Sequence, residues 1–247
     1  MRLVKDAISQ NALGKLAWLA FDMAKELIKA TRGGKIAVII DDAFQILGTK
    51  ESAIYVKALL NLIEYPPAEY ERVLTIVATS EGSSRREIGR HTWAHLDILW
   101  NMPKEGFKQL YNQIPGSKPD FDTVWRLTGG NPRMLGELIV RGGWDTGAVT
   151  DWLIESKTIT QGLINKWRSL LEKAIEDPDI LWSDAPEELL NELTEHNLII
   201  YPLSDRDSTA WVDQPPPERD PELGIGKHVA WQSPLHREAI KRALQTS

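Results

Sequence analysis

Apolar positions in the first half of the chain follow two kinds of pattern. Residues 35–40 and 72–79 are short, mostly apolar runs, which are typical of strands buried on both faces of a parallel sheet. Residues 6–31 and 50–63 repeat apolar positions at steps of three and four, as an amphipathic helix does. A third strand is expected within residues 95–102. Strands that alternate with helices predict an α/β fold with a largely parallel sheet.

The pattern changes close to Gly142 and Gly143. Helical spacing dominates the residues that follow, and two short apolar segments then flank a polar, proline-rich stretch before a last helix. The expected elements are helices within 149–177 and 185–196, strands within 197–203 and 228–234, and a helix over 235–244. Helices followed by two strands with a long connection describe a winged-helix module. We therefore predict an α/β domain over residues 1–141 and a helical plus winged-helix domain over residues 142–247.

The composition narrows the class of protein. With 42% apolar and 26% charged residues, the chain is similar to ordinary globular proteins. Its longest apolar runs are far shorter than the ~20 residues that a membrane span requires. It contains no cysteine, which excludes disulfides, thiolate nucleophiles and Cys-ligated zinc. The first residues also lack the uninterrupted apolar stretch of a signal peptide. We therefore expect a cytoplasmic protein with no membrane contact.

Tryptophan is frequent, with ten residues in the chain. Trp125, Trp152, Trp167 and Trp182 fall at apolar positions of the expected helices. This placement predicts that their rings pack in the core and do not stack on bases.

The acidic excess of the chain lies in its second half. The formal net charge is −6, and residues 149–247 hold the surplus of Asp and Glu. Affinity for duplex DNA depends largely on Lys and Arg that neutralise phosphates, so this half is a poor general DNA binder. Arg237, Lys241 and Arg242 nevertheless form a small basic stripe on the last expected helix. DNA is therefore a disfavoured partner that the sequence leaves open.

Two adjacent acids, Asp41 and Asp42, follow the first apolar run. The carboxyl ends of parallel strands face the crevice in which α/β proteins bind ligands. Acidic residues placed there commonly hold Mg²⁺ through water, and a second acid can orient a water for attack on a phosphate. The alternative is an ordinary pair of aspartates that caps the next turn.

Three further features follow in order along the chain. Thr79 and Ser80 end the next apolar run, so their hydroxyls are expected at the same sheet edge as the two acids. Arginines, whose forked guanidinium suits phosphate oxygens, come next at positions 85, 86 and 90. Later, Gly129 and Gly130 permit close approach of the backbone to a ligand, and Pro132 fixes φ at a helix entry.

In this order, the motifs resemble the second half of a STAND-type P-loop NTPase, on the signal-transduction branch near AAA+. The resemblance is closest to the predominantly archaeal ATPase family, and the motifs also resemble those of NB-ARC domains. It implies that "IAVIIDD" is a Walker B segment in which Asp41 serves Mg²⁺ through water and Asp42 is the catalytic acid. It also implies that "ATS" is sensor 1, with Ser80 or Thr79 as its polar group.

The same resemblance assigns the remaining motifs. Arg90, in "GR", would contact phosphate. "GGNP", with Gly129 and Gly130, resembles the G-x-P motif, in which Pro132 would pack by the adenine or ribose. The implied cofactors are ATP and Mg²⁺. The winged helix would pack on the nucleotide domain and report its state, which describes a regulatory switch with a protein partner or a second copy of the chain.

The most specific motif of such proteins, G-x-x-x-x-G-K-[ST], is absent from the sequence. Gly14-Lys15 is no substitute, because Ser9 stands where the first glycine belongs and Leu16 where the hydroxyl belongs. The resembling fold places the P-loop strand between the sensor 1 strand and the strand that matches residues 95–100. The chain is therefore expected to be incomplete or inactive alone.

Three explanations of this absence stay open: a fragment or late-start gene model of a full ATPase, a degenerate paralogue that keeps the fold as a scaffold, and a partner chain that supplies the P-loop. The function hypotheses follow the same lines. The first is an ATPase module acting as a nucleotide-dependent switch. The others are a DNA-associated winged-helix protein on a non-catalytic scaffold, and a subunit of a hetero-oligomer.

Overall fold

The computed structural model describes residues 12–30, 34–41, 43–66, 68–69, 71–80 and 95–246. The chain divides into two compact units, Met1–Leu96 and Asp97–Ser247, and each is described by itself. Residues 97–141 cluster with the second unit. The domain border near residue 142 stays a prediction.

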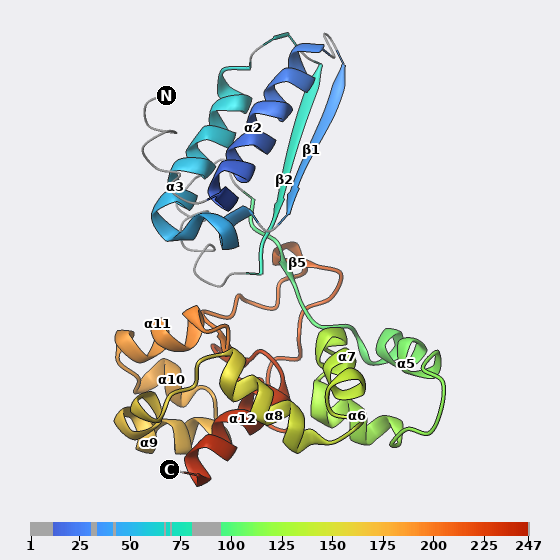
Figure 1. Cartoon of the computed structure of the whole chain (residues 1–247), viewed down its shortest axis with the longest axis vertical. Coiled ribbons are helices and arrows are strands. Elements are labelled where there is room, and N and C mark those ends of the chain that lie inside the picture. Colours follow the sequence, from blue (N-terminus) through green and yellow to red (C-terminus); the bar gives the residue numbers. More distant parts are fainter. Residues whose placement is uncertain are drawn as a thin grey trace. The chain divides into compact units, whose positions relative to one another are not determined.

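The first unit consists of a parallel strand pair and two long helices. Its described elements are α2 (Ala12–Ala30), β1 (Lys35–Asp41), α3 (Ala43–Glu64) and β2 (Arg72–Ala78). β1 and β2 pair in parallel, from Lys35 opposite Arg72 to Asp41 opposite Ala78. Both helices lie on the same side of the strand pair (Figure 1). The α/β class and the parallel pairing that the sequence predicts are confirmed for this unit.

Aromatic side chains hold the two helices of this unit together. The Tyr55 ring on α3 is fully buried and packs edge-on against Trp18 of α2, with ring centroids 5.2 Å apart. The Tyr55 hydroxyl donates a hydrogen bond to the Ala17 carbonyl at 3.0 Å, and burial raises its pKa to about 12. Phe21 completes the cluster, 5.8 Å from Trp18. Burial of these rings, with the Tyr55 hydroxyl hydrogen-bonded, fixes which face of α2 points inward.

The other face of the strand pair is exposed. Side chains alternate between the faces of a strand, and on β1 and β2 only one set packs on the helices. Ile39 is 71% exposed, and its cross-strand partner Ile76 and the neighbouring Leu74 are exposed as well. The prediction of strands buried on both faces is therefore wrong, because the described helices cover one side only.

The second unit consists mainly of helices (Figure 1). It also contains two small strand pairs. Its elements are β3 (Ile98–Leu99), α5 (Lys104–Asn112), α6 (Phe121–Thr128), α7 (Pro132–Val140), α8 (Thr146–Ser156), α9 (Gln161–Glu176), α10 (Ile180–Ser183), α11 (Glu187–Glu195), β4 (Ile199–Ile200), β5 (Trp211–Val212), β6 (Ala230–Trp231) and α12 (Pro234–Gln245). The main core surrounds α12, which packs against α8 and α9. Trp231 and Leu235 lie in that core almost without exposure.

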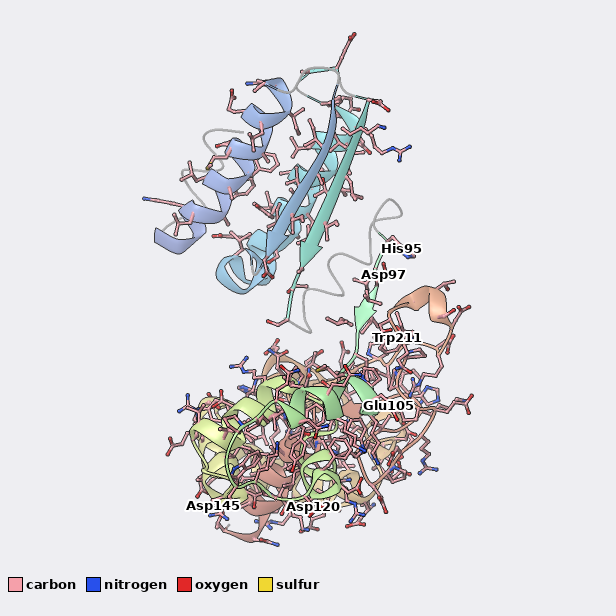
Figure 2. The ribbon with its side chains drawn as sticks, turned by 90° about the vertical axis from the view of Figure 1, so that its right-hand side faces the viewer. His95, Asp97, Glu105, Asp120, Asp145 and Trp211 are labelled. Atoms are coloured by element: carbon pink, nitrogen blue, oxygen red, sulfur yellow. The ribbon has the colours of Figure 1, made fainter. Side chains whose placement is uncertain are left out.

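Side-chain caps explain where several of these helices begin. Asp120 accepts from the Thr123 N–H at 3.0 Å before α6, and Asp145 accepts from the Gly147 N–H at 2.8 Å before α8 (both labelled in Figure 2). Thr160 caps α9 through the Leu163 N–H. The helical pattern expected within residues 149–177 therefore comprises two helices, α8 and α9, since a new cap starts the second one.

The predicted third strand lies in a separate sheet, whereas the resemblance implied a place in the same sheet as the first two strands, next to the P-loop strand. β3 pairs in parallel with β5, with Ile98 opposite Trp211, and not with the β1–β2 pair. The Trp100 and Trp211 rings pack edge-on at 6.0 Å, and Ile98 packs on the same small core (Trp211 is labelled in Figure 2). This long-range aromatic packing, which local spacing does not reveal, explains the pairing.

The predicted packing of the four tryptophans is confirmed for three of them. Trp125, Trp152 and Trp167 are half-buried and pack against hydrophobic clusters. Trp182 is the exception, because its ring is about half-exposed and stacks on His228 with centroids 4.6 Å apart. None of the helices in the described part of the chain combines the length and apolar character that crossing a membrane requires.

Candidate functional site

The carboxyl end of the parallel strand pair brings together several of the predicted site residues. Asp41 is the last residue of β1 and lies opposite Ala78, and Thr79 and Ser80 directly follow β2. The register therefore puts an acidic residue and two hydroxyl-bearing residues at one sheet edge, and their roles stay predictions. The Asp41 and Ser80 residues are exposed, and the alternation of β1 puts Asp41 on the same face as Ile39.

Two predicted catalytic residues, Asp42 and Arg90, lie outside the described residues, as do Arg85 and Arg86. Their roles stay predictions. α3 begins at Ala43, directly after Asp42 in the sequence. The capping alternative that the sequence left open for Asp42 likewise stays a prediction.

The edge offers few oxygen ligands for a metal ion. Among the described residues, no group of three or more His, Asp or Glu side chains could hold one. Mg²⁺ at nucleotide sites commonly uses one or two carboxylates and completes its shell with waters and substrate phosphates. Asp41 fits such a role if phosphate oxygens supply the rest of the shell.

Gly129, Gly130 and Pro132 form the turn between α6 and α7 in the second unit. Gly129 ends α6 with φ 59°, and its N–H donates to the Trp125 carbonyl at 2.8 Å. Gly130 follows with φ 79°. The Asn131 side chain then caps α7, whose first residue is Pro132. Both glycines therefore have left-handed backbone conformations, which residues with a Cβ rarely adopt.

Atoms of the chain itself lie close to these glycines. A Cβ at Gly130 would lie 2.3 Å from the Met102 carbonyl oxygen and 3.0 Å from the Trp125 ring. A Cβ at Gly129 would lie 2.9 Å from Pro234. The sequence analysis expected a ligand to approach the backbone at these two glycines. At their Cβ positions, atoms of the protein itself make this close approach. Pro132 is exposed.

Sequence reasoning missed a polar network that holds the long connection between β4 and β6. Asp179, at the start of α10, accepts hydrogen bonds from the backbone N–H groups of Lys227, His228 and Val229, at 2.7, 2.8 and 3.3 Å. Burial raises the pKa of Asp179, but these hydrogen bonds outweigh burial and hold the pKa below its usual range. In the sequence, Asp179 is simply an acid before a helical pattern. Nothing in that pattern indicates hydrogen-bond partners so much later in the chain.

Arg206 is the second anchor of this connection. Its guanidinium donates to five backbone carbonyls on both arms of the loop, those of Ser204, Pro217, Glu218, Gly226 and Lys227. The guanidinium can serve five carbonyl acceptors at once because it holds five N–H donors in a rigid fork. The proline-rich segment is therefore tied to the second unit by one side chain.

The basic stripe on α12 is engaged within the chain. Arg242 forms a two-pronged ion pair with Asp151 at 2.6 and 2.9 Å, and Arg237 donates to the carbonyls of Pro221 and Glu222. Lys241 lies 3.8 Å from Glu238. These contacts occupy the groups that a phosphate backbone would need.

His236, in the first turn of α12, is buried and shares a hydrogen bond of 2.8 Å with the Ser233 hydroxyl. Burial, together with the positive charges of Lys157 and Arg133, lowers its pKa to about 3. Its neutral form is therefore the one that the fold accommodates.

We expect the free energy of unfolding to fall as the pH is lowered below the ordinary histidine pKa. The unfolded chain binds a proton at position 236 between about pH 6.5 and pH 3, and the folded chain does not, so stability is lost as the pH falls through that window. The loss from pH 7 to pH 5.5 is roughly 1 kcal/mol. Urea unfolding at several pH values checks this, and His236→Gln should flatten the slope. Equal slopes in the two proteins would contradict the assignment.

Comparison with known proteins gives one match. A family model described as an ATPase domain predominantly from Archaea matches residues 2–138. The matched span is more than half of the chain and runs from before α2 into α7. No curated protein and no solved structure matches the chain.

Proposed function

Because this chain belongs to the family of ATPase domains found predominantly in Archaea, we propose that it handles ATP and Mg²⁺ as a nucleotide-dependent regulatory switch of the STAND/AAA+ type. Family membership implies nucleotide binding. The observation that carries the proposal is the parallel register of β1 and β2, which places Asp41 at the same sheet edge as Thr79 and Ser80. Ligands of open α/β sheets bind at this edge.

The proposed roles follow the chemistry of phosphoryl transfer. Asp41 holds Mg²⁺ through water, Asp42 orients the attacking water, and Ser80 or Thr79 senses the terminal phosphate. Arg90 stabilises phosphate charge. Pro132 of the second unit is exposed, and its contact with a nucleotide stays a prediction.

We propose that residues 142–247 are a helical plus winged-helix module that reports the nucleotide state. The antiparallel pairing of β4 with β6, followed by α12, supports this interpretation. A DNA-associated function on a non-catalytic scaffold is the alternative. The ion pair of Arg242 with Asp151 and the backbone contacts of Arg237 argue against it.

The P-loop is proposed to come from outside these 247 residues, either from the same polypeptide or from the partner in a hetero-oligomer. The sequence contains no G-x-x-x-x-G-K-[ST]. Parallel sheets are normally covered on both faces, whereas the face of Ile39 and Ile76 is exposed. The proposed segment would pack on this face and supply phosphate donors.

Calorimetric titration with Mg²⁺–ATP tests the need for the P-loop. We expect the 247-residue chain to show no micromolar affinity, because the lysine and backbone N–H groups that hold the β- and γ-phosphates are missing. Micromolar affinity that is lost in Asp41→Ala would contradict this expectation.

The switch itself is tested in the presence of a P-loop-bearing segment or partner chain. There we expect Asp41→Ala to lower ATP affinity in Mg²⁺ by at least about tenfold, the effect of losing one good metal contact. Glu71→Ala is the matched control, because Glu71 precedes the other end of β2. An Asp41→Ala protein that binds and hydrolyses ATP like the control would refute the proposed function.

A further inference from the structure

Side chains from the helices of the second unit hold one arm of the long connection between β4 and β6. We call residues 204–226 of this connection the strap. After β5, Arg219 of the strap forms an ion pair with Asp177 at 2.7 Å, and Arg237 of α12 donates to two strap carbonyls. These contacts tie the later arm of the strap to the helical core.

The earlier arm of the strap, which contains β5, is held by β3. Arg206 ties the start of this arm to backbone carbonyls of the later one. Beyond it, β5 pairs in parallel with the two residues of β3, and the buried Trp211 ring packs edge-on against Trp100. The outward side chains of the pair, Leu99 and Val212, are 74% and 49% exposed. Segments with so few buried contacts open at a lower free energy than the core of a domain.

Strand β3 lies at the border between the two units. The first unit ends at Leu96, and β3 is the first element of the second unit (Asp97 is labelled in Figure 2). Further along, the Met102 N–H donates to the Gly130 carbonyl at 3.0 Å, which fixes the chain to the turn between α6 and α7. Asn101, just before it, has a long hydrogen bond of 3.4 Å. Pairing with β5 is therefore the main hold on the residues between the border and Met102.

We propose that β3 and β5 form a clasp, which opens while the helical core of the second unit stays folded and which then releases residues 97–101 from the strap. Met102 remains bound to Gly130, so the release stops there. The five released residues add about 16 Å of extended chain to the connection between the units. The clasp is thus a conformational device that sets the length of this connection. It goes beyond the proposed function and does not rest on it.

Hydrogen–deuterium exchange of the full chain, followed by mass spectrometry without nucleotide, tests whether the clasp opens as one piece. Peptides that cover β3 and β5 are expected to exchange at similar rates, at least 100-fold faster than peptides from α12. Exchange of both strands at the rate of α12 would mean that the pair opens only when the whole unit unfolds. That result, or clearly different rates for the two strands, would overturn the proposal.

A disulfide across the clasp gives a second test, because the chain has no cysteine of its own. Leu99 and Val212 lie opposite each other and are exposed, so Leu99→Cys with Val212→Cys can form the bond outside the small core. The oxidised double variant is expected to exchange at least tenfold more slowly in β3 and β5 than the same protein after reduction, with α12 unchanged. Equal exchange before and after reduction would contradict opening, and cysteines that stay unlinked under oxidising conditions would reject the pairing.

Trp100→Leu should shift the clasp in the other direction. It removes the ring that packs against Trp211, so exchange of both strands is expected to rise at least fivefold. Trp182→Leu is the matched control, since Trp182 belongs to the same unit but stacks on His228. Faster exchange in β3 alone, or an equal effect of the two variants, would show that the strands do not open together through this contact. Circular dichroism of each variant checks that the helices are retained.

Discussion

Gly130→Ala is expected to lower the free energy of unfolding of the second unit by roughly 3 kcal/mol, through a left-handed backbone and a steric clash. Gly130 has φ 79°, and an added Cβ would lie 2.3 Å from the Met102 carbonyl oxygen. That oxygen belongs to backbone held by the hydrogen bond from Met102 N–H to Gly130 O, 3.0 Å long. Urea unfolding followed by tryptophan fluorescence, without nucleotide, measures the effect.

Gly116→Ala is the matched control for this experiment. Gly116 has φ 86°, but nothing lies within 4 Å of its Cβ position, so only the backbone strain of about 1 kcal/mol is expected. The difference between the two variants isolates the steric contribution. If Gly130→Ala were as stable as Gly116→Ala and changed only ATP binding, the glycine would serve the nucleotide and not the packing.

Asp179→Ala is expected to destabilise the second unit by about 3 kcal/mol, because three backbone N–H groups lose a charged acceptor. These N–H groups belong to Lys227, His228 and Val229. The depressed pKa of Asp179 adds a pH signature: its contribution is present above the ordinary carboxyl pKa and is lost as the pH falls through the lower folded value. Acid unfolding of the variant should therefore be less steep.

Asp184→Ala provides the comparison, since Asp184 is an exposed aspartate that follows α10. We expect it to change stability by no more than about 0.5 kcal/mol. Chemical unfolding at neutral pH distinguishes the two variants. Equal stability would mean that water replaces Asp179 at the three N–H groups and that the loop needs no anchor.

The sequence predicted those elements that depend on residues close together in the chain. The apolar runs of β1 and β2 and the edge position of Asp41 follow from residues adjacent in sequence, and both are found. Helix α6 is bounded by two signals that are also local, the capping aspartate Asp120 before it and Gly129 after it.

What the sequence could not predict depends on distant contacts. The partner of β3 is decided by Trp211, far along the chain, and the break between α8 and α9 by a cap at Thr160 within an otherwise continuous apolar pattern. The role of Gly130 depends on Met102 and Trp125. Arg206 carries no local signal at all, because its five acceptors are backbone carbonyls brought together only by the fold.

The strand pair of the first unit has a practical consequence for making the protein. In the described part of the chain, β1 and β2 each have one neighbour, so each leaves a row of backbone donors and acceptors along its outer edge, next to apolar side chains such as Ile39. Exposed edges of this kind recruit further strands and promote aggregation. Recombinant production of the first unit by itself therefore calls for a solubilising fusion or co-expression with whatever covers the sheet.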